Sequence, residues 1–269
     1  MSEGSTIGLI GAGNMATAMV DGWMRADGDR ARRVLVTDRG SGRADRLAAR
    51  HGLERAASNA HLVERADVVV ISVKPIDVER VLREVSSLVT PDKAVASVAA
   101  GVATTTMETI LDEDAPVFRF MPNVGVSVCA GTLCFAQGRF ADTAAEARVL
   151  DWFGLLGTVV PLEERLFDAA TALAGSGPAF LGLLVEAFED AGIVSGLSAP
   201  KARELILSTM VGTARLLDES GLSCSELRRM VTSPGGTAAA GLAQMERASV
   251  RGGIIDGVLA AMRRAGELG

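Results

Sequence analysis

The segment at residues 230–242 reads Met-Val-Thr-Ser-Pro-Gly-Gly-Thr-Ala-Ala-Ala-Gly-Leu and carries no ionisable side chain. Its proline and paired glycines predict a tight turn at the start of a helix. Backbone N–H groups of residues 231–236 can converge in such a turn, and a nest of N–H groups beside a helix N-terminus binds anions. The segment therefore predicts a site for a carboxylate or a phosphate of a small ligand.

A second motif, Gly11-Ala12-Gly13-Asn14-Met15-Ala16, lies between a predicted strand at residues 6–10 and a predicted helix at residues 14–25. In this GxGxxA pattern, Gly11 permits a tight turn and Gly13 lets the backbone approach a pyrophosphate. Ala16 allows the helix to pack closely on the strand. The pattern in this context predicts dinucleotide binding, and the competing interpretation is a purely structural turn.

The end of the next predicted strand, at residues 34–37, bears on the choice of dinucleotide. Asp38 is placed to accept a hydrogen bond from a ribose 2′-hydroxyl, which favours NAD. Arg39, Ser41 and Arg43 follow and could instead hold a 2′-phosphate, or be solvated loop residues. The sequence thus leaves NADH and NADPH open, with a slight preference for NADH.

Three further junctions follow predicted strands on the same edge of the sheet. They are Val73-Lys74-Pro75, the turn around Ala100, and Met121-Pro122-Asn123. Ligands bind at the carboxyl edge of parallel sheets, so we expect these loops to surround the nicotinamide.

The pattern of apolar residues predicts two domains. Strands and helices alternate over residues 1–162, which is typical of a Rossmann dinucleotide-binding domain with a mostly parallel sheet. Residues 163–269 show helical patterns throughout, and the helix predicted at residues 177–195 is apolar over most of its circumference. Because that helix is hard to solvate, we expect an α/β fold whose all-helical C-terminal domain forms a homodimer. The other predicted strands are residues 67–73, 94–98, 117–121, 132–136 and 158–162.

Composition narrows the possible partners. The net charge of −6 argues against nucleic acid or an acidic membrane surface as a partner. The longest apolar runs, such as residues 67–73 and 180–185, are too short to span a bilayer. The first residues form no basic region of a secretory signal, and the three cysteines show no metal-binding spacing. We therefore expect a cytoplasmic protein with reduced cysteines, no metal and no membrane partner.

The residue types that are rare or missing restrict the chemistry. The chain has no tyrosine, two histidines and three lysines, so few side chains can donate a proton near neutral pH. Reduction of a ketone needs a good acid because an alkoxide forms. An iminium ion is already protonated, and hydride addition gives a neutral amine. A reductase of a small imino acid fits these residues better than a ketone reductase.

Over nearly its whole length the chain resembles the pyrroline-5-carboxylate reductase family. The resemblance rests on residues 11–16, 73–75, 97–101, 119–123, 174–180 and 231–241, among which Gly-Ser-Gly-Pro-Ala and Ser-Pro-Gly-Gly-Thr are quite specific. It implies an N-terminal Rossmann domain and a helical domain intertwined in a dimer, often in a ring of dimers. It also implies NAD(P)H-dependent reduction of 1-pyrroline-5-carboxylate to L-proline.

The resemblance further implies roles for single residues. The dinucleotide would be held by Gly11, Gly13, Asn14, Met15 and Ala16, with Asn59 and Lys74 nearby. The substrate carboxylate would be held by Val231, Ser233, Gly235, Gly236 and Thr237, and Ser176 would line the pocket.

Two departures from the family pattern leave alternatives open. Asn123 is followed by Val124-Gly125 where the family usually has Thr-Pro, and Ala238 stands where the family usually has a threonine. Thr237 is then the candidate catalytic hydroxyl, with water or a substrate that enters protonated as the alternatives. A paralogue that reduces another cyclic imine in specialised metabolism, and a non-catalytic nucleotide-binding protein, are the competing functions.

Overall fold

The computed structural model describes residues 4–111 and 114–267. By their contacts the residues form two compact units: one comprises the chain up to Gly175 together with the chain from Met262 on, and the other is Ser176–Ala261. The boundary between functional domains that the sequence predicts, at residues 162 and 163, stays a prediction.

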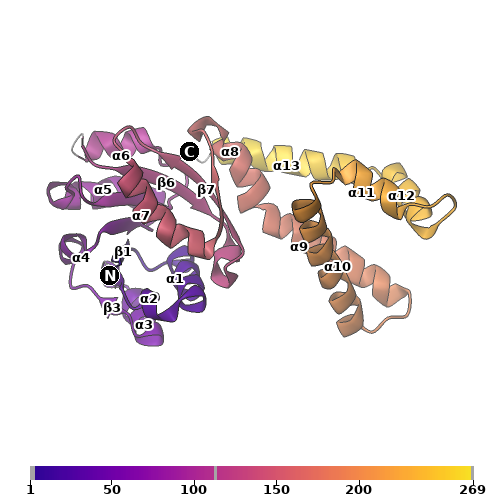
Figure 1. Ribbon diagram of the computed structural model, residues 1–269, viewed down its shortest axis with the longest axis horizontal. Coiled ribbons are helices and arrows are strands. Elements are labelled where there is room, and N and C mark those ends of the chain that lie inside the picture. The colour runs from indigo at the N-terminus through magenta and orange to yellow at the C-terminus, as the bar shows by residue number, and fades with distance from the viewer. Residues whose placement is uncertain (1–3, 112–113, 268–269) are drawn as a thin grey trace. The chain divides into compact units, whose positions relative to one another are not determined.

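The first unit is built on one eight-stranded sheet with the strand order β3-β2-β1-β4-β5-β6-β7-β8 (Figure 1). All neighbouring strands are parallel except β6 and β7, which are antiparallel. The strands are β1 Ile7–Ile10, β2 Val34–Thr37, β3 Glu54–Arg55, β4 Val68–Ile71, β5 Ala94–Ser97, β6 Val117–Pro122, β7 Gly131–Gln137 and β8 Gly157–Pro161.

Helices cover both faces of this sheet. Every residue of β1, β2, β4 and β5 is buried, as expected for strands with a helical layer on each side. One layer consists of α1 (Asn14–Ala26), α3 (Arg43–His51) and α7 (Thr143–Phe153). The other consists of α4 (Asn59–Arg65), α5 (Pro75–Val85) and α6 (Thr104–Ile110). This confirms the expected Rossmann architecture.

The sequence pattern left four short elements unassigned: α2 (Gly28–Ala31), α3, β3 and α4. Helix α3 is rich in arginine and buries only Ala44, Leu47 and Ala48, so its apolar periodicity is weak. Strand β3 has two residues, too few for any alternation to be visible. Short 3₁₀ segments complete the unit at η1 (Ser86–Leu88), η2 (Val124–Val128), η3 (Gly154–Leu156) and η4 (Glu164–Leu166).

The start of the helical half, residues 163–175, does not form one continuous α-helix. After η4 and α8 (Phe167–Ala170), the chain forms a π-helical turn, η5 (Thr171–Gly175). The carbonyl oxygen of Ala174 in this turn accepts a hydrogen bond from Nδ2 of Asn123 at 3.1 Å. A π-helical turn orients its carbonyl groups differently from an α-helix. The Ala174 carbonyl that bonds to Asn123 is one of the groups affected by this change.

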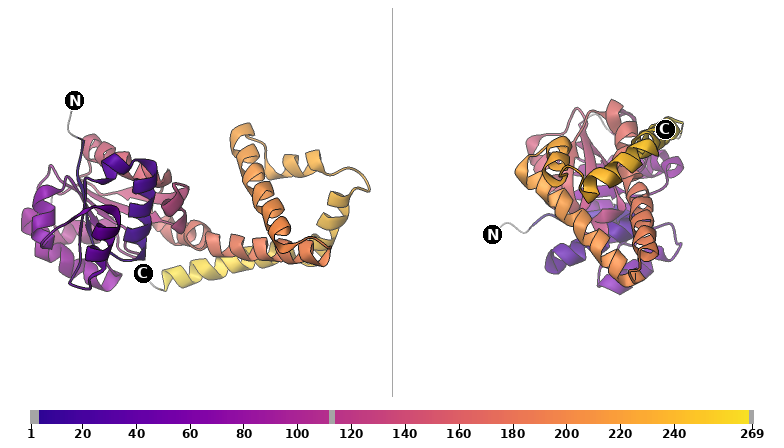
Figure 2. Two further views of the ribbon diagram at one scale, coloured as in Figure 1. Left: turned by 90° about the horizontal axis from the view of Figure 1, so that it is seen from below. Right: turned by 90° about the vertical axis from the view of Figure 1, so that its right-hand side faces the viewer.

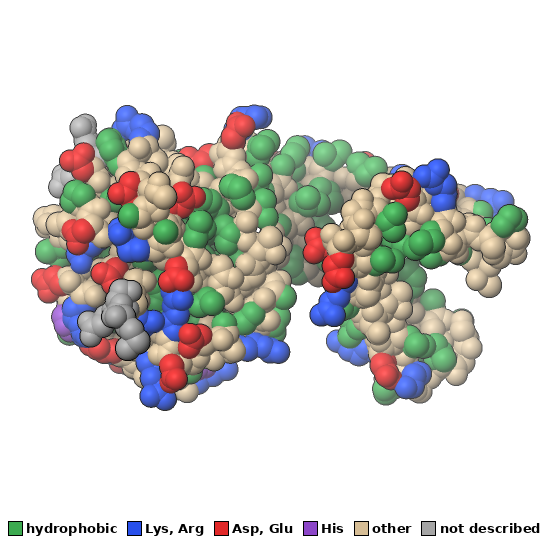
Figure 3. Space-filling view, in the orientation of Figure 1, with side chains coloured by type: hydrophobic (Ala, Val, Ile, Leu, Met, Phe, Trp, Pro, Cys, Tyr) green, Lys and Arg blue, Asp and Glu red, His purple; other side chains and the backbone are tan. Residues whose placement is uncertain are grey.

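The second unit is helical, as predicted, and most of its side chains are exposed in the single chain (Figure 3). Helices α9 and α10 pack against each other, while α11 and α12 project away from this pair (Figure 2). Within the described residues of this unit, Ala202 alone is buried. The helices are α9 Gly177–Val194, α10 Ala199–Ser220, α11 Cys224–Val231, α12 Thr237–Arg247 and α13 Val250–Gly266, the last of which ends in the first unit.

One helical stretch, Glu164–Val194, is long and apolar enough by length and composition to cross a membrane. This corrects the expectation that every apolar run is too short, because consecutive helical turns join through η5 into 31 residues. Only 11% of its most apolar window is buried in the single chain. An exposed apolar surface of this kind is typical of a site that contacts another protein or a membrane.

Candidate functional site

A cavity of about 480 Å³ opens at the carboxyl ends of β1, β2 and β4 in the first unit. Strand order reverses beside β1, and ligands of doubly wound sheets bind at such a switch point. Seven of the residues predicted to bind the cofactor line this cavity: Gly11, Gly13, Asp38, Arg39, Asn59, Val73 and Lys74.

The two glycines of the fingerprint have different local environments. Gly11 has φ +107°, and a Cβ there would overlap the carbonyl oxygen of Ser72. Gly13 has an ordinary φ of −79°, and a Cβ there would meet none of the described atoms within 4 Å. The space beside Gly13 therefore remains available for a ligand, as the phosphate-binding interpretation requires.

The first turn of α1 faces this space without a protein partner. The N–H groups of Asn14, Met15 and Ala16 bond to none of the residues that the structure describes. Unpaired N–H groups at a helix N-terminus attract an anion such as pyrophosphate. Ala16 is fully buried against the sheet, and its side chain allows the close packing expected there.

The carboxylate of Asp38 is occupied by its own loop. It accepts hydrogen bonds from the N–H groups of Gly40, Arg43 and Ala44 at 2.9–3.1 Å and from the hydroxyl of Ser41. Burial disfavours the charged form, but these hydrogen bonds outweigh it, so the pKa of Asp38 lies below its ordinary value. Within the described chain this carboxylate bonds to its own loop and to the first turn of α3, and its expected contact with a ribose hydroxyl stays a prediction.

The other six predicted cofactor residues lie outside the cavity wall, Met15 and Ala16 among them. Asn14 lines a smaller neighbouring cavity, and Pro75 begins α5 directly after Lys74. Ala100 lies in an exposed turn after β5. The side chain of Asn123 bonds to Ala174, Gly125 and Thr132, which gives it a structural role that the sequence did not indicate.

Asn59 does line the cavity, but its amide is already held. Its Nδ2 atom lies 3.1 Å from both carboxylate oxygens of Glu84. Sequence reasoning also missed Ile76 and Asp77, which line the cavity from the first turn of α5. The sequence could have indicated both residues by their position: they follow Lys74-Pro75 directly, at the start of a helix on the carboxyl edge of the sheet.

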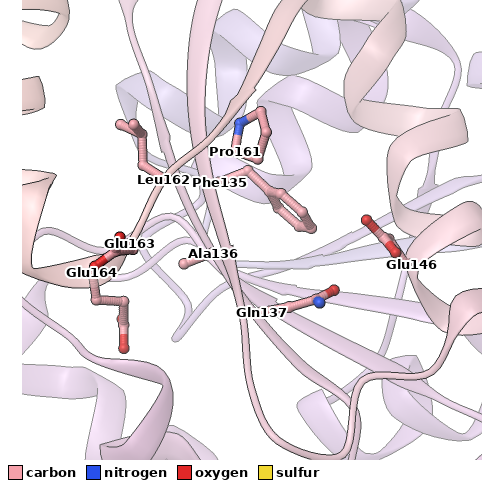
Figure 4. A pocket seen from close by; sticks show the side chains of 8 residues that line it. All are labelled: Phe135, Ala136, Gln137, Glu146, Pro161, Leu162, Glu163 and Glu164. Carbon is pink, nitrogen blue, oxygen red and sulfur yellow. The ribbon is translucent and has the colours of Figure 1, made fainter.

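Another cavity of the first unit, about 420 Å³, does not fit a dinucleotide (Figure 4). Its wall includes Glu146, Glu163 and Glu164, and a phosphate would be repelled by three carboxylates. Glu164 is engaged there by the N–H and hydroxyl of Thr104 and by Arg119.

The predicted anion-binding turn of the second unit connects α11 and α12. Residues Ser233 to Gly236 close a β-turn in which the N–H of Gly236 bonds to the carbonyl of Ser233 at 3.0 Å. Pro234 in the second position and Gly235 at φ +69° in the third are typical of a type II turn.

The N–H groups available to an anion include two that the sequence suggested, because those of Ser233 and Gly235 bond to none of the described residues. Thr232 and Gly236 use theirs in backbone hydrogen bonds, and Val231 is the last residue of α11. The N–H groups of Thr237, Ala238 and Ala239 open α12 and bond to none of the described residues. The turn and the first turn of α12 therefore both offer N–H groups to an anion.

Thr237 is the exposed first residue of α12, and its hydroxyl has no hydrogen-bond partner within the described chain. Ser176, also expected near the substrate, precedes α9 and is half-buried. Its carbonyl accepts from Ala179 and Phe180, and no bond of its hydroxyl is formed with a described residue.

Family models match both the N-terminal and the C-terminal part of the chain. Residues 164–268 match the model of the pyrroline-5-carboxylate reductase dimerisation domain, and residues 6–101 match that of the coenzyme F420-dependent NADP oxidoreductases. The pyrroline-5-carboxylate reductase of Methanosarcina acetivorans is 35% identical to this chain, over 99% of each protein.

Solved structures of the same family share the fold. The pyrroline-5-carboxylate reductase of Coxiella burnetii has a TM-score of 0.88 at 33% identity and covers 98% of each chain. The pyrroline carboxylate reductase of Plasmodium falciparum, solved with NADP bound, has a TM-score of 0.83 at 25% identity, covering 98% of this chain and 97% of that one. With full-length relatives at this identity, the chain belongs to the pyrroline-5-carboxylate reductase family.

Proposed function

We propose that this protein reduces 1-pyrroline-5-carboxylate to L-proline with NADH or NADPH. The observation that carries the proposal is the start of α12, where three unpaired N–H groups meet in a segment without any ionisable side chain. Such a turn binds a substrate carboxylate without supplying an acid or a base. The cavity at Gly11, Gly13 and Lys74 supports a dinucleotide as the reductant.

The reaction fits a site that is poor in acids. The bound dinucleotide supplies a hydride to the ring carbon of the C=N bond, and the electron pair of that bond passes to nitrogen. Thr237 can donate a hydrogen bond to the ring nitrogen of the neutral imine from its hydroxyl, and its N–H group would bond to the substrate carboxylate. A substrate that enters as the iminium needs no further proton during this step.

We further propose that the second unit forms the homodimer. Leu183, Phe188 and Val211 are exposed in the single chain, and the dimerisation model covers this region. A second copy that packs on these apolar helices would also explain why the helical stretch Glu164–Val194 is apolar, without any contact with a membrane. We also propose that the dimers assemble into a ring and that the protein is cytoplasmic. The cytoplasmic location is supported by the cysteines, all three of which are free.

Ala238 keeps one alternative substrate open. The family resemblance places a threonine at this position, and its loss removes a hydroxyl from the first turn of α12. A related cyclic imine that binds differently at this turn is the second candidate substrate.

Steady-state oxidation of NADH and NADPH tests the proposal. We expect turnover with 1-pyrroline-5-carboxylate and a much lower kcat/KM with 1-pyrroline, which lacks the carboxylate. Higher kcat/KM for 1-pyrroline would contradict the carboxylate site and favour the second candidate.

A further inference from the structure

One carboxylate joins three elements of the first unit. Glu164, in η4, accepts a hydrogen bond from the N–H group of Thr104 at 3.0 Å and another from its hydroxyl at 2.8 Å. The same carboxylate lies 3.2 Å from the guanidinium of Arg119 in β6. Glu164 is 60 positions from Thr104 and 45 from Arg119 in the sequence, so these contacts connect α6 and β6 to the start of the helical half.

The bonds to Thr104 supply a cap that α6 otherwise lacks. Thr104 is the first residue of α6, and the preceding Ala103 makes no side-chain cap hydrogen bond. The first N–H groups of a helix have no partner within it, and the helix dipole favours a negative charge beside them. Glu164 therefore fixes the point at which α6 begins.

The loop that ends at this cap lies on the edge of the sheet that carries the dinucleotide cavity. It comprises residues 98–103, between β5 and α6, and β5 is parallel to β4, whose following residues line the cavity. Gly101 has φ +73°, and the N–H groups of Ala100 and Gly101 bond to none of the described residues. Glu164 thus holds one end of a loop whose tip can face a ligand.

The bond to Arg119 extends the connection towards the loop after β6. The guanidinium of Arg119 lies 4.2 Å from the ring centre of the buried Phe167, and the arginine side chain is 12% exposed. Alternate residues of a strand share a face, and on this face Met121 and Asn123 contact η5. One face of β6 is therefore held by the segment that begins at Glu164.

Such a connection can affect hydride transfer without contact with either reactant. Binding of a dinucleotide depends strongly on its phosphates, which suit the first turn of α1. The rate depends on the placement of the nicotinamide, and a displacement of about 1 Å can cost roughly a hundredfold. The loops after β5 and β6 are two of the three that we expect beside that ring, and Glu164 is bonded to α6 and β6, which adjoin them.

We propose that Glu164 is a positioning residue of the reductase. Its carboxylate holds the loops after β5 and β6 so that the nicotinamide and the imine carbon meet in a reactive geometry. Glu164 itself touches neither the dinucleotide nor the substrate, and its effect passes through Thr104 and Arg119. This role rests on the proposed function, because it concerns the same hydride transfer.

Glu164→Gln tests this role, because glutamine keeps the size of the side chain and removes its charge. The single-turnover rate of NADPH oxidation by 1-pyrroline-5-carboxylate should fall roughly tenfold to a hundredfold. Calorimetric titration should give a dissociation constant for NADP⁺ within about twofold of the parent, because the phosphate site at α1 is unchanged. Glu163→Gln is the matched control: its carboxylate (Figure 4) pairs with the exposed Arg165, and the parent's rate should be retained.

Loss of a helix cap elsewhere separates positioning from stability. Asp142 caps α7 by accepting a hydrogen bond from the N–H group of Ala145. Helix α7 follows β7, which is antiparallel to β6, so this cap lies at the opposite edge of the sheet. Asp142→Ala should lower the melting temperature and keep the parent's rate. If Glu164→Gln does the same, the role of Glu164 is only structural and the proposal is overturned.

Thr104→Val keeps the proposal testable if Glu164→Gln does not fold, because it removes only the hydroxyl that bonds to Glu164. Its rate should fall by a smaller factor, and Thr104→Ser should restore the rate. In the double variant the two losses should not multiply, because both remove the same contact. An unchanged rate in Thr104→Val, or losses that multiply, would overturn the path through Thr104.

Emission of bound NADPH, excited directly in its nicotinamide band, reports on the ring without any imine. Its quantum yield should be lower in Glu164→Gln than in the parent, since a less restrained ring loses its excitation faster without emission. Identical emission in the two proteins would overturn the positioning role. Lower emission in the variant, with no reduction of 1-pyrroline-5-carboxylate by the parent, would refute the proposed function and leave the role of Glu164 standing.

Discussion

The side-chain amide of Asn123 donates a hydrogen bond to the carbonyl oxygen of Ala174, 3.1 Å away, across 51 residues of sequence. The same side chain accepts from the N–H groups of Gly125 and Thr132 through its Oδ1 atom. Asn123 thus joins the end of β6 to the π-turn η5, where the first unit ends.

Asn123→Ala should destabilise the protein more than it weakens cofactor binding. Loss of three hydrogen bonds at a half-buried side chain is expected to cost roughly 1–3 kcal/mol. Chemical denaturation measures this change, and NADP⁺ titration should show an affinity within about twofold of the parent. A large loss of NADP⁺ affinity at unchanged stability would instead restore the nicotinamide role that the sequence suggested.

The two fingerprint glycines should respond differently to substitution. Gly13→Val should fold with little change in melting temperature, because a Cβ there meets no described atom within 4 Å, yet lose dinucleotide binding. Gly11→Ala is the contrasting variant: it should destabilise the fold, since the residue has φ +107° and its Cβ would overlap Ser72. Unaltered cofactor affinity in folded Gly13→Val would refute the assigned fingerprint.

The sequence predicted the architecture well wherever burial was strong. The apolar runs at residues 34–36 in β2 and throughout β4 were recognisable because both faces of the sheet are covered. Helix α3 was missed because its burial depends on three small or medium side chains among arginines. The family and the class of reaction followed from the motifs, and the comparisons confirm them.

The predicted site residues were harder to interpret, because contacts distant in sequence decide their roles. Asp38 was visible as a residue after β2, but its capping of α3 could not be inferred while α3 itself was unrecognised. Asn123 was visible as a loop residue, but its partner Ala174 lies in a π-turn, which leaves no periodic signal in the sequence.

Thr237→Val should lower kcat for 1-pyrroline-5-carboxylate roughly tenfold to a hundredfold, as expected for loss of one hydrogen bond to a charged or developing centre. KM should change little, because the backbone N–H group at the start of α12 remains. Thr237→Ser keeps the hydroxyl and is expected to retain most of the rate. If kcat for Thr237→Val equals that of the parent, the hydrogen bond comes from water or the substrate enters protonated.

Leu183→Asp should convert the dimer to smaller species. The side chain is 66% exposed in the single chain and belongs to the apolar helix α9, so a buried carboxylate would result at the interface. Sedimentation velocity measures the change, with Val128→Asp, an exposed apolar residue outside the dimerisation segment, as the matched control. A monomeric parent protein at micromolar concentration would be incompatible with the proposed dimer.

The most direct measurement of the central claim is coupled detection of cofactor oxidation and product. Protein, NADPH and 1-pyrroline-5-carboxylate are incubated, and loss of the reduced nicotinamide is compared with L-proline formed. One L-proline for each NADPH oxidised, abolished in folded Gly13→Val, is the predicted result. Binding of dinucleotide without oxidation of either NADPH or NADH would contradict the account.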